Sequence, residues 1–160
     1  MLGHLTIALL RSFLLSGTAA THGVRRGRLP GMMHSLLVAL GGAAGALARW
    51  KLSGIILHRT VDWRFPAATF AVNVIGCLVA GVLVGLVTRR EWFSADARLF
   101  LFTGLLGGFT TFSAFGVETV YLLRRGEHAV ALAYVLLSVV CSVAGLALGM
   151  AIIPGRGAVP

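Results

Sequence analysis

The sequence predicts an all-α integral membrane protein with four transmembrane helices, the third of which is broken near its centre. Two observations indicate this fold class. The 160 residues are 58% hydrophobic and only 12% charged, with a mean hydropathy of +0.91, which lies outside the usual range of soluble domains. Apolar blocks long enough to cross a hydrocarbon core, which takes about 20 helical residues, recur along the chain.

The four predicted spans cover about 35–57, 66–87, 99–123 and 129–153. The second and fourth contain no charged residue, and the third contains only Glu118. Arg49 and Lys51 interrupt the second half of the first block, but its earlier residues are all apolar or small. We therefore expect one transmembrane domain over residues 32–154, followed by a short C-terminal tail at 155–160.

Residues 1–31 differ in character, and we predict that they are an N-terminal extension outside the fold. The apolar stretch Leu5–Leu15 is too short to span a membrane and is broken by Arg11. A signal peptide is one alternative, although the positively charged start of such a peptide is missing. We favour a start of translation at Met32 or Met33, or a disordered extension.

Each predicted span carries two glycines four residues apart. The pairs are Gly41 and Gly45, Gly81 and Gly85, Gly104 and Gly108, and Gly145 and Gly149. Such small faces let helix backbones approach closely, which is how apolar helices associate in lipid. We therefore expect a tightly packed bundle that forms an oligomer.

The basic residues lie mostly in the gaps between apolar blocks. The net charge of +9 is compatible with nucleic-acid binding, but arginines at these positions anchor helix ends at lipid headgroups, so no nucleic-acid partner is expected. Arg89, Arg90, Arg98 and Arg156 fall on one side of a four-span bundle, and Arg59, Arg64, Arg124 and Arg125 fall on the other. This tally leaves out residues 1–31, and an even tally permits insertion in both orientations and therefore an antiparallel dimer. If the extension is present in the mature chain, its arginines at 11, 25, 26 and 28 tip the balance. Neither the cysteines nor the histidines show metal-ligand spacing.

The centre of the third block, GLLGGFTTFSAFGVE at residues 104–118, is unusual for a lipid-facing helix. Two glycines followed by two threonines weaken helix propensity where a continuous span needs it most. Irregular backbone at this depth requires protein or a cavity around it. A break would free the carbonyls from Gly107 to Thr110, and such oxygens suit a hard cation such as Na⁺.

Polar and aromatic residues inside the spans are the candidates for function, because burying polar groups in lipid is expensive. Asn73 and Thr69 share one face of the second span, where the Asn73 amide could donate to an anion or to a neighbouring helix. Phe112 and Phe115 share a face beside Ser113, and the positive edges of their rings suit an anion, although plain packing is the commoner role of such pairs.

In the fourth span, Tyr134, Ser138 and Ser142 repeat every four residues and place three hydroxyls in one stripe. Hydroxyls in this arrangement can line a pore. They can also bond to backbone carbonyls one turn earlier, which is the usual role of serine in a transmembrane helix.

In these residues the chain resembles the CrcB/Fluc family of fluoride channels, from about Leu36 to Ile153. The string GGAAGALARW resembles the family's opening pattern, with Arg49 in its arginine position. TFAVNVIG resembles the segment that contains the conducting asparagine, here Asn73. GGFTTFSAF resembles the diagnostic third-span signature. Ala67 and Ala68 stand where the family usually has a glycine before Thr69.

The resemblance implies a fluoride-specific channel, not an enzyme, in a bacterial inner membrane. It implies an antiparallel, dual-topology homodimer with two pores and a structural Na⁺ at the dimer centre, although pairing with a paralogous subunit stays open. Gly107 and Thr110 would hold Na⁺ through backbone carbonyls. The pore residues would be Arg49, Thr69, Asn73, Phe112, Ser113, Phe115, Glu118, Tyr134, Ser138 and Ser142.

Two other functions compete with this interpretation. A small four-helix multidrug exporter works by proton exchange and needs a carboxylate in its first span, where this chain has Arg49 and Lys51 and no acid. A non-transporting membrane protein could instead organise partner helices through its small-residue faces. Fluoride flux from liposomes distinguishes these possibilities.

Overall fold

The computed structural model describes residues 30–90 and 92–154, and within them the regular structure is entirely helical. The predictions for residues 1–29 and for the tail after residue 154 therefore fall outside the described residues. Four helical spans are long and apolar enough to cross a membrane: Gly31–Arg59, Ala67–Arg89, Ala95–Arg124 and His128–Ile152. The predicted all-α fold with four spans is confirmed.

The first, second and fourth spans are single helices: α2 (Pro30–Arg59), α3 (Ala67–Arg90) and α7 (His128–Ile152). The third span is made of four pieces, namely α4 (Ala95–Arg98), the π-helix η1 (Leu99–Leu106), α5 (Gly107–Phe109) and α6 (Phe112–Arg124). Three of the four spans extend past the apolar blocks to a terminal arginine. Such side chains reach the lipid headgroups, so the helix does not need to end where the hydrocarbon ends.

Glycine contacts join the helices in two pairs. A Cβ on Gly41 would lie 2.6 Å from the Phe100 carbonyl oxygen and 3.0 Å from Gly104 Cα, so α2 and η1 touch backbone to backbone. On the other side of the bundle, a Cβ on Gly149 would overlap the Leu78 carbonyl oxygen and would lie 2.8 Å from Val82 N. All four predicted glycine pairs lie at these two seams or close to them, which confirms the expected close packing.

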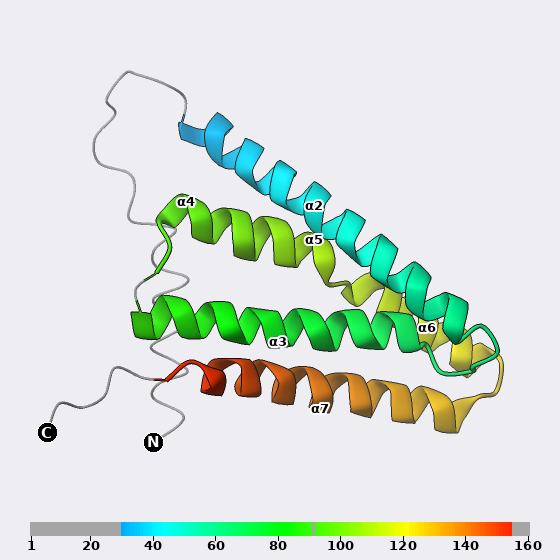
Figure 1. Cartoon of the computed structure of the whole chain (residues 1–160). Helices are drawn as coiled ribbons and strands as arrows, with labels where there is room; N and C mark the ends of the chain where they lie inside the picture. Colours follow the sequence, from blue (N-terminus) through cyan, green and yellow to red (C-terminus); the bar gives the residue numbers. More distant parts are fainter. Residues whose placement is uncertain (1–29, 91, 155–160) are drawn as a thin grey trace, which may run out of the picture. The chain divides into compact units, whose positions relative to one another are not determined.

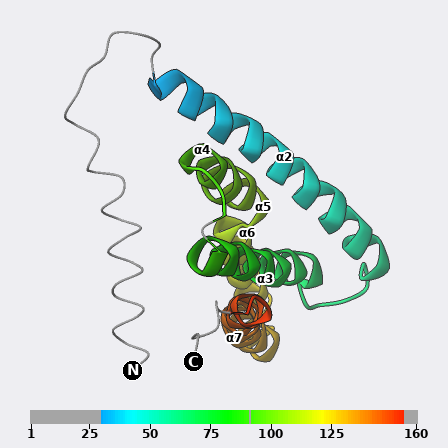
Figure 2. The same cartoon turned by 60° about the vertical axis from the view of Figure 1, so that its left-hand side comes forward.

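The third span belongs to the first pair and also contacts the second. Its first half lies beside α2, and the chain changes direction between α5 and α6 (Figure 1). After this change, α6 packs against α7 and α3. Figure 2 shows α2 on one side of α4 and α5, and α7 on the far side of α3. The third span thus reaches the helices of both pairs.

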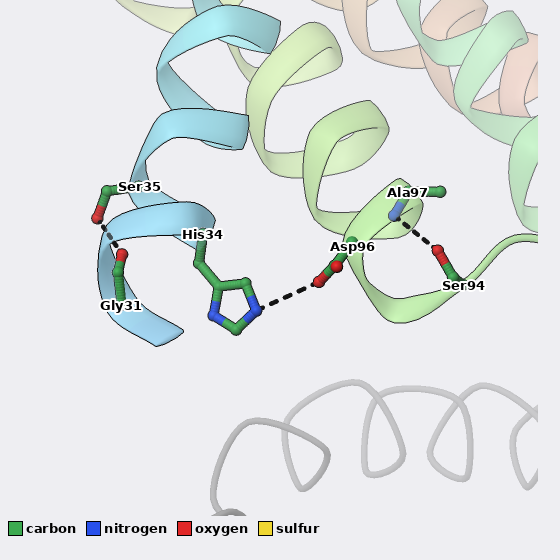
Figure 3. A network of polar contacts seen from close by, with 6 residues as sticks. All are labelled: Gly31, His34, Ser35, Ser94, Asp96 and Ala97. Atoms are coloured by element: carbon green, nitrogen blue, oxygen red, sulfur yellow. Dashed lines mark hydrogen bonds and ion pairs between the residues drawn. The ribbon is translucent and has the colours of Figure 1, made fainter. Parts of the chain in front are cut away.

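One ion pair joins the beginnings of α2 and α4, beside hydrogen bonds within each helix end (Figure 3). His34 Nε2 lies 3.2 Å from Asp96 Oδ1, and both side chains are more than half exposed. Ser94 caps α4 by accepting a hydrogen bond from the Ala97 N–H.

Two tryptophans, Trp63 and Trp92, are exposed in connections at opposite ends of the spans, where tryptophans favour the membrane interface.

One cluster of buried apolar residues lies toward one end of the bundle. It consists of Leu122, Ala131 and Tyr134, with Phe65, Phe70, Phe115 and Val130 packed around them. Many large apolar side chains are exposed along the outer faces of all the spans. A soluble monomer rarely exposes so much apolar surface, and lipid accommodates it.

Candidate functional site

The break in the third span lies at Thr110 and Thr111, inside the predicted segment. Thr110 has φ −81° and ψ 158°, and Thr111 has φ −149° and ψ 118°, so both residues are extended between two helical pieces. The hydroxyl of Thr111 begins α6 by accepting a hydrogen bond from the Ala114 N–H at 3.2 Å. The Thr110 N–H and hydroxyl both donate to the Leu106 carbonyl at 2.9 Å, so the last helical hydrogen bond before the break is doubled by a side chain. Thr111 therefore caps the helix that follows the break, and Thr110 bonds back to the helix that precedes it.

Asn73 on α3 holds the broken backbone. Its Oδ1 accepts the Thr111 N–H at 2.9 Å, and its Nδ2 donates to the Thr111 carbonyl at 3.0 Å. In a continuous helix the Thr111 N–H would donate to the Gly107 carbonyl. Because Asn73 takes this donor, the Gly107 oxygen loses its usual helical partner.

The helix α3 also makes room for the break. A Cβ on Gly76 would overlap the Thr110 side chain and would lie 3.2 Å from the Phe109 ring. Gly76 lies three residues after Asn73, on the same side of α3. The segment around Asn73 thus combines a polar clamp for the break with the space that the break requires.

After the break, the Glu118 carboxylate on α6 links this helix to α3 and α7 by hydrogen bonds. Its Oε1 accepts a hydrogen bond from the Thr69 hydroxyl at 2.7 Å, and its Oε2 accepts one from the Tyr134 hydroxyl at 2.6 Å. Tyr134 is fully buried and Thr69 is nearly so. The two donors satisfy both oxygens of a carboxylate that lies inside the membrane-spanning part, where an unpaired charge is costly.

Aromatic rings continue from this carboxylate toward the break. The ring centroids of Phe115 and Tyr134 are 5.1 Å apart, and those of Phe112 and Phe115 are 5.3 Å apart. Phe115 is half-buried, but Phe112 is 83% exposed. The two phenylalanines therefore form the predicted adjacent pair, with one ring inside the chain and the other open on its surface.

The hydroxyl stripe on α7 points partly into the chain. The Ser138 side chain is buried, and its Oγ has no hydrogen-bond partner among the described residues. Ser142, one turn further, is half-buried. Ser138 does not bond to a backbone carbonyl one turn earlier, so the usual structural role of a membrane serine does not explain it.

The structure thus brings together most of the predicted residues, on α3, α6 and α7. Arg49 lies apart from them, half-buried on α2, without a recorded hydrogen bond or ion pair in the described residues. Ser113 is exposed beside the break, 3.3 Å from the Thr111 hydroxyl.

Sequence reasoning missed three features. The clamp between Asn73 and Thr111 joins residues far apart in the chain, and no local signal identifies it. The role of Gly76 depends on what lies opposite it. The π-helix η1 has an apolar sequence, LFLFTGLL, without a breaking residue before Gly104. Such wide turns often occur near functional sites.

A comparison with protein-family models finds a match over residues 36–150 to the family described as "CrcB-like protein, Camphor Resistance (CrcB)". The chain belongs to the CrcB family. This match covers all four helical spans almost completely, including the break and the residues that surround it.

Curated CrcB relatives support this assignment. A protein of Methylobacillus flagellatus is 52% identical over 122 residues, which are 76% of this chain and 95% of the relative. Relatives from Paracoccus denitrificans (47% over 127 residues, 79% and 98%) and Rhizobium leguminosarum bv. trifolii (46% over 121 residues, 76% and 96%) are similar. Each is named "Fluoride-specific ion channel FluC".

The CrcB relatives are thus named as ion channels and not as enzymes. Together with the four membrane-spanning helices, they identify this chain as a multi-pass bacterial membrane protein. The predicted family and location are confirmed.

Proposed function

We propose that this protein is a fluoride-specific channel through which fluoride leaves the cytoplasm passively, so that its concentration and toxicity fall. The observation that carries the proposal is the break at Thr110 and Thr111, clamped by Asn73 beside the Phe112 and Phe115 rings. Relatives that share up to 52% identity with this chain are named fluoride-specific channels.

The energetics support a passive pore. Fluoride enters acid-exposed cells as neutral HF and dissociates at cytoplasmic pH, where the cost of crossing hydrocarbon traps the anion. An inside-negative potential favours anion exit by about 2.3 kcal/mol per 100 mV. Because the membrane potential drives fluoride out, a pore that admits fluoride and excludes larger ions needs no pump.

The polar groups of the cluster suit a small anion. An asparagine amide carries two N–H groups, and among the described residues only Thr111 accepts from Asn73 Nδ2, so a second N–H remains that can donate to an ion. The unpartnered Ser138 hydroxyl offers a second donor. The Phe112 and Phe115 rings add weakly positive edges, which hold an anion loosely enough to release it.

The functional unit we propose is an antiparallel homodimer. Phe112 is 83% exposed, and Val117 at 70% and Val120 at 52% lie exposed on the same helix, so one copy leaves part of the site uncovered. A second copy of this chain would cover it. When residues 1–31 are left out, the arginines are evenly distributed over the two ends, which permits the opposite orientations that such a dimer needs.

A structural Na⁺ at the dimer centre is also proposed. The donor type fits, because the Gly107 carbonyl has lost its helical donor to Asn73, Gly107 is exposed, and hard cations bind carbonyl oxygens. Gly107 and Thr110 of each copy would supply the oxygens. When bound, the ion would supply only positive charge and would stabilise the interface.

Fluoride efflux from proteoliposomes, read with an ion-selective electrode, tests the function. We expect fluoride-specific, proton-independent flux from the wild-type protein and its loss in Phe112→Ile and Phe115→Ile. Phe102→Ile, in η1, is the matched control and should keep its flux. An exporter would need a proton gradient and a non-transporting protein would show no flux, so either result would refute the proposal.

Whether the two copies are antiparallel requires a separate experiment. Copies of this chain with a tag accessible from opposite sides of the membrane should crosslink to each other. Crosslinks only between copies of the same orientation would refute the dual-topology dimer.

A further inference from the structure

A cavity lies at the end of the bundle where α2 leads into α3 and α6 leads into α7. Its volume is about 380 Å³. The charged residues that line it are Asp62, Arg64, Glu118, Arg125 and Glu127. The lining thus combines the connection at 60–66 with the end of α6 and the start of the next connection.

The cavity communicates with the interior through Glu118. This residue lines the cavity, and its carboxylate accepts hydrogen bonds from the buried hydroxyls of Thr69 and Tyr134. Ser138 follows Tyr134 one turn along α7. The cavity is therefore the place where the buried polar groups meet the surface at this end of the chain.

The charges around the cavity do not favour an anion on their own. Asp62, Glu118 and Glu127 contribute three carboxylates, while Arg64 and Arg125 contribute two cations. Without Arg64, one cation would face three carboxylates. The loss of Arg64 would therefore double the net negative charge of the lining, from −1 (2 − 3) to −2 (1 − 3).

Glu127 holds Arg64 in place. Arg64 Nη1 lies 3.0 Å from Glu127 Oε1 and 3.2 Å from Oε2. The Arg64 side chain is 73% exposed, whereas that of Glu127 is only 21% exposed. An ion pair this exposed contributes little to stability, so its effect on the local potential is the more important consequence.

We propose that Arg64 is a charge-compensating residue at the mouth of the fluoride path, where it cancels the Glu127 carboxylate that would otherwise repel entering anions. This inference rests on the proposed channel function. It assigns opposite roles to the two partners: Arg64 raises the local fluoride concentration and Glu127 lowers it.

The size of the cavity determines how strongly a charge in its wall changes the local fluoride concentration. A sphere of about 380 Å³ is about 9 Å across, so a wall charge acts on a passing ion over roughly that distance. In water, one unit charge at about 9 Å changes the local concentration of a monovalent anion about twofold. Two charge units, as in Arg64→Glu, change it about fourfold to fivefold.

The test is the initial rate of fluoride efflux from proteoliposomes at about 10 mM ionic strength and subsaturating fluoride, where screening is weak. We expect Arg64→Gln to lower the rate about twofold and Glu127→Gln to raise it about twofold. The double variant Arg64→Glu with Glu127→Lys should return close to the wild-type rate. Arg124→Gln is the control, because this exposed arginine lies at the same end but outside the cavity lining, and it should change the rate less.

Salt separates an electrostatic role from a structural one. At about 0.5 M of an impermeant salt the differences between variants should largely disappear, because the Debye length falls to about 4 Å. If the two single Gln variants shift the rate in the same direction, leave it unchanged, or differ equally at high salt, the inference is wrong. Absence of fluoride flux in the wild-type protein would instead overturn the channel function itself.

Discussion

Replacing Asn73 with leucine tests what holds the third span in its broken form. Leucine has the same branched shape and the same number of side-chain heavy atoms as asparagine, although it is bulkier, and it cannot form the two hydrogen bonds to Thr111. Both backbone groups of Thr111 then lose the α3 partner that fixes the position of the break. We therefore expect this segment to open more often in Asn73→Leu than in the wild-type protein.

The size of the effect follows from the two contacts, at 2.9 and 3.0 Å. Each hydrogen bond contributes about 1 kcal/mol net, and a buried N–H left without a partner costs about 1–3 kcal/mol. The free energy of local opening should therefore fall by about 2–3 kcal/mol, which is a factor of about 30 to 150 in the opening equilibrium.

Hydrogen–deuterium exchange measured by mass spectrometry in detergent micelles reports this opening. The Thr111 amide should exchange about 30 to 150 times faster in Asn73→Leu than in the wild-type protein. Thr69→Val is the matched control, because it removes a hydroxyl from the same face of α3 that bonds to Glu118 and not to the break. Unchanged exchange at Thr111 in Asn73→Leu would show that the clamp does not hold the break.

Three further changes probe packing and the polar cluster. Gly45→Ala should lower the free energy of unfolding by about 1–3 kcal/mol, because its Cβ would overlap the Leu105 carbonyl. Gly42→Ala should be nearly neutral, because the atom nearest to its Cβ lies 4.0 Å away. Tyr134→Phe should cost about 1.5–3 kcal/mol, because it removes a hydroxyl that donates to a carboxylate. Ser138→Ala should leave stability within about 1 kcal/mol of the wild type but reduce fluoride efflux, since its hydroxyl has no partner among the described residues. Equal losses in both glycine variants, or unchanged efflux in Ser138→Ala, would contradict this reasoning.

The positions of the spans could be predicted because they depend on local properties. Hydrophobic length alone identifies four helices, and the glycine spacing predicts which faces touch. The partners of these faces could not be predicted in this way. The contact of Gly41 with Gly104, and of Gly81 with Leu146, depends on how the helices are arranged in space.

The break in the third span likewise has a local cause, which the sequence shows, and a non-local one, which it does not. The run of two glycines and two threonines weakens the helix locally, and the structure places the break inside that run. What stabilises it is non-local, because Asn73 lies 38 positions before Thr111. The bond between Glu118 and Thr69 spans 49 positions, and the sequence offers no reason to pair those two residues.

The polar and aromatic cluster around the break is buried on one side only. A single copy of the chain buries Thr69, Tyr134 and Ser138. Phe112, which belongs to the same polar and aromatic cluster, remains 83% exposed. A path that strips water from an ion needs walls on all sides, because open contact with lipid would leave the ion without partners. One copy supplies the inner wall only. In the channel we propose, the exposed face of α6 therefore has to meet protein, and an inverted second copy of this chain is the partner we propose for it.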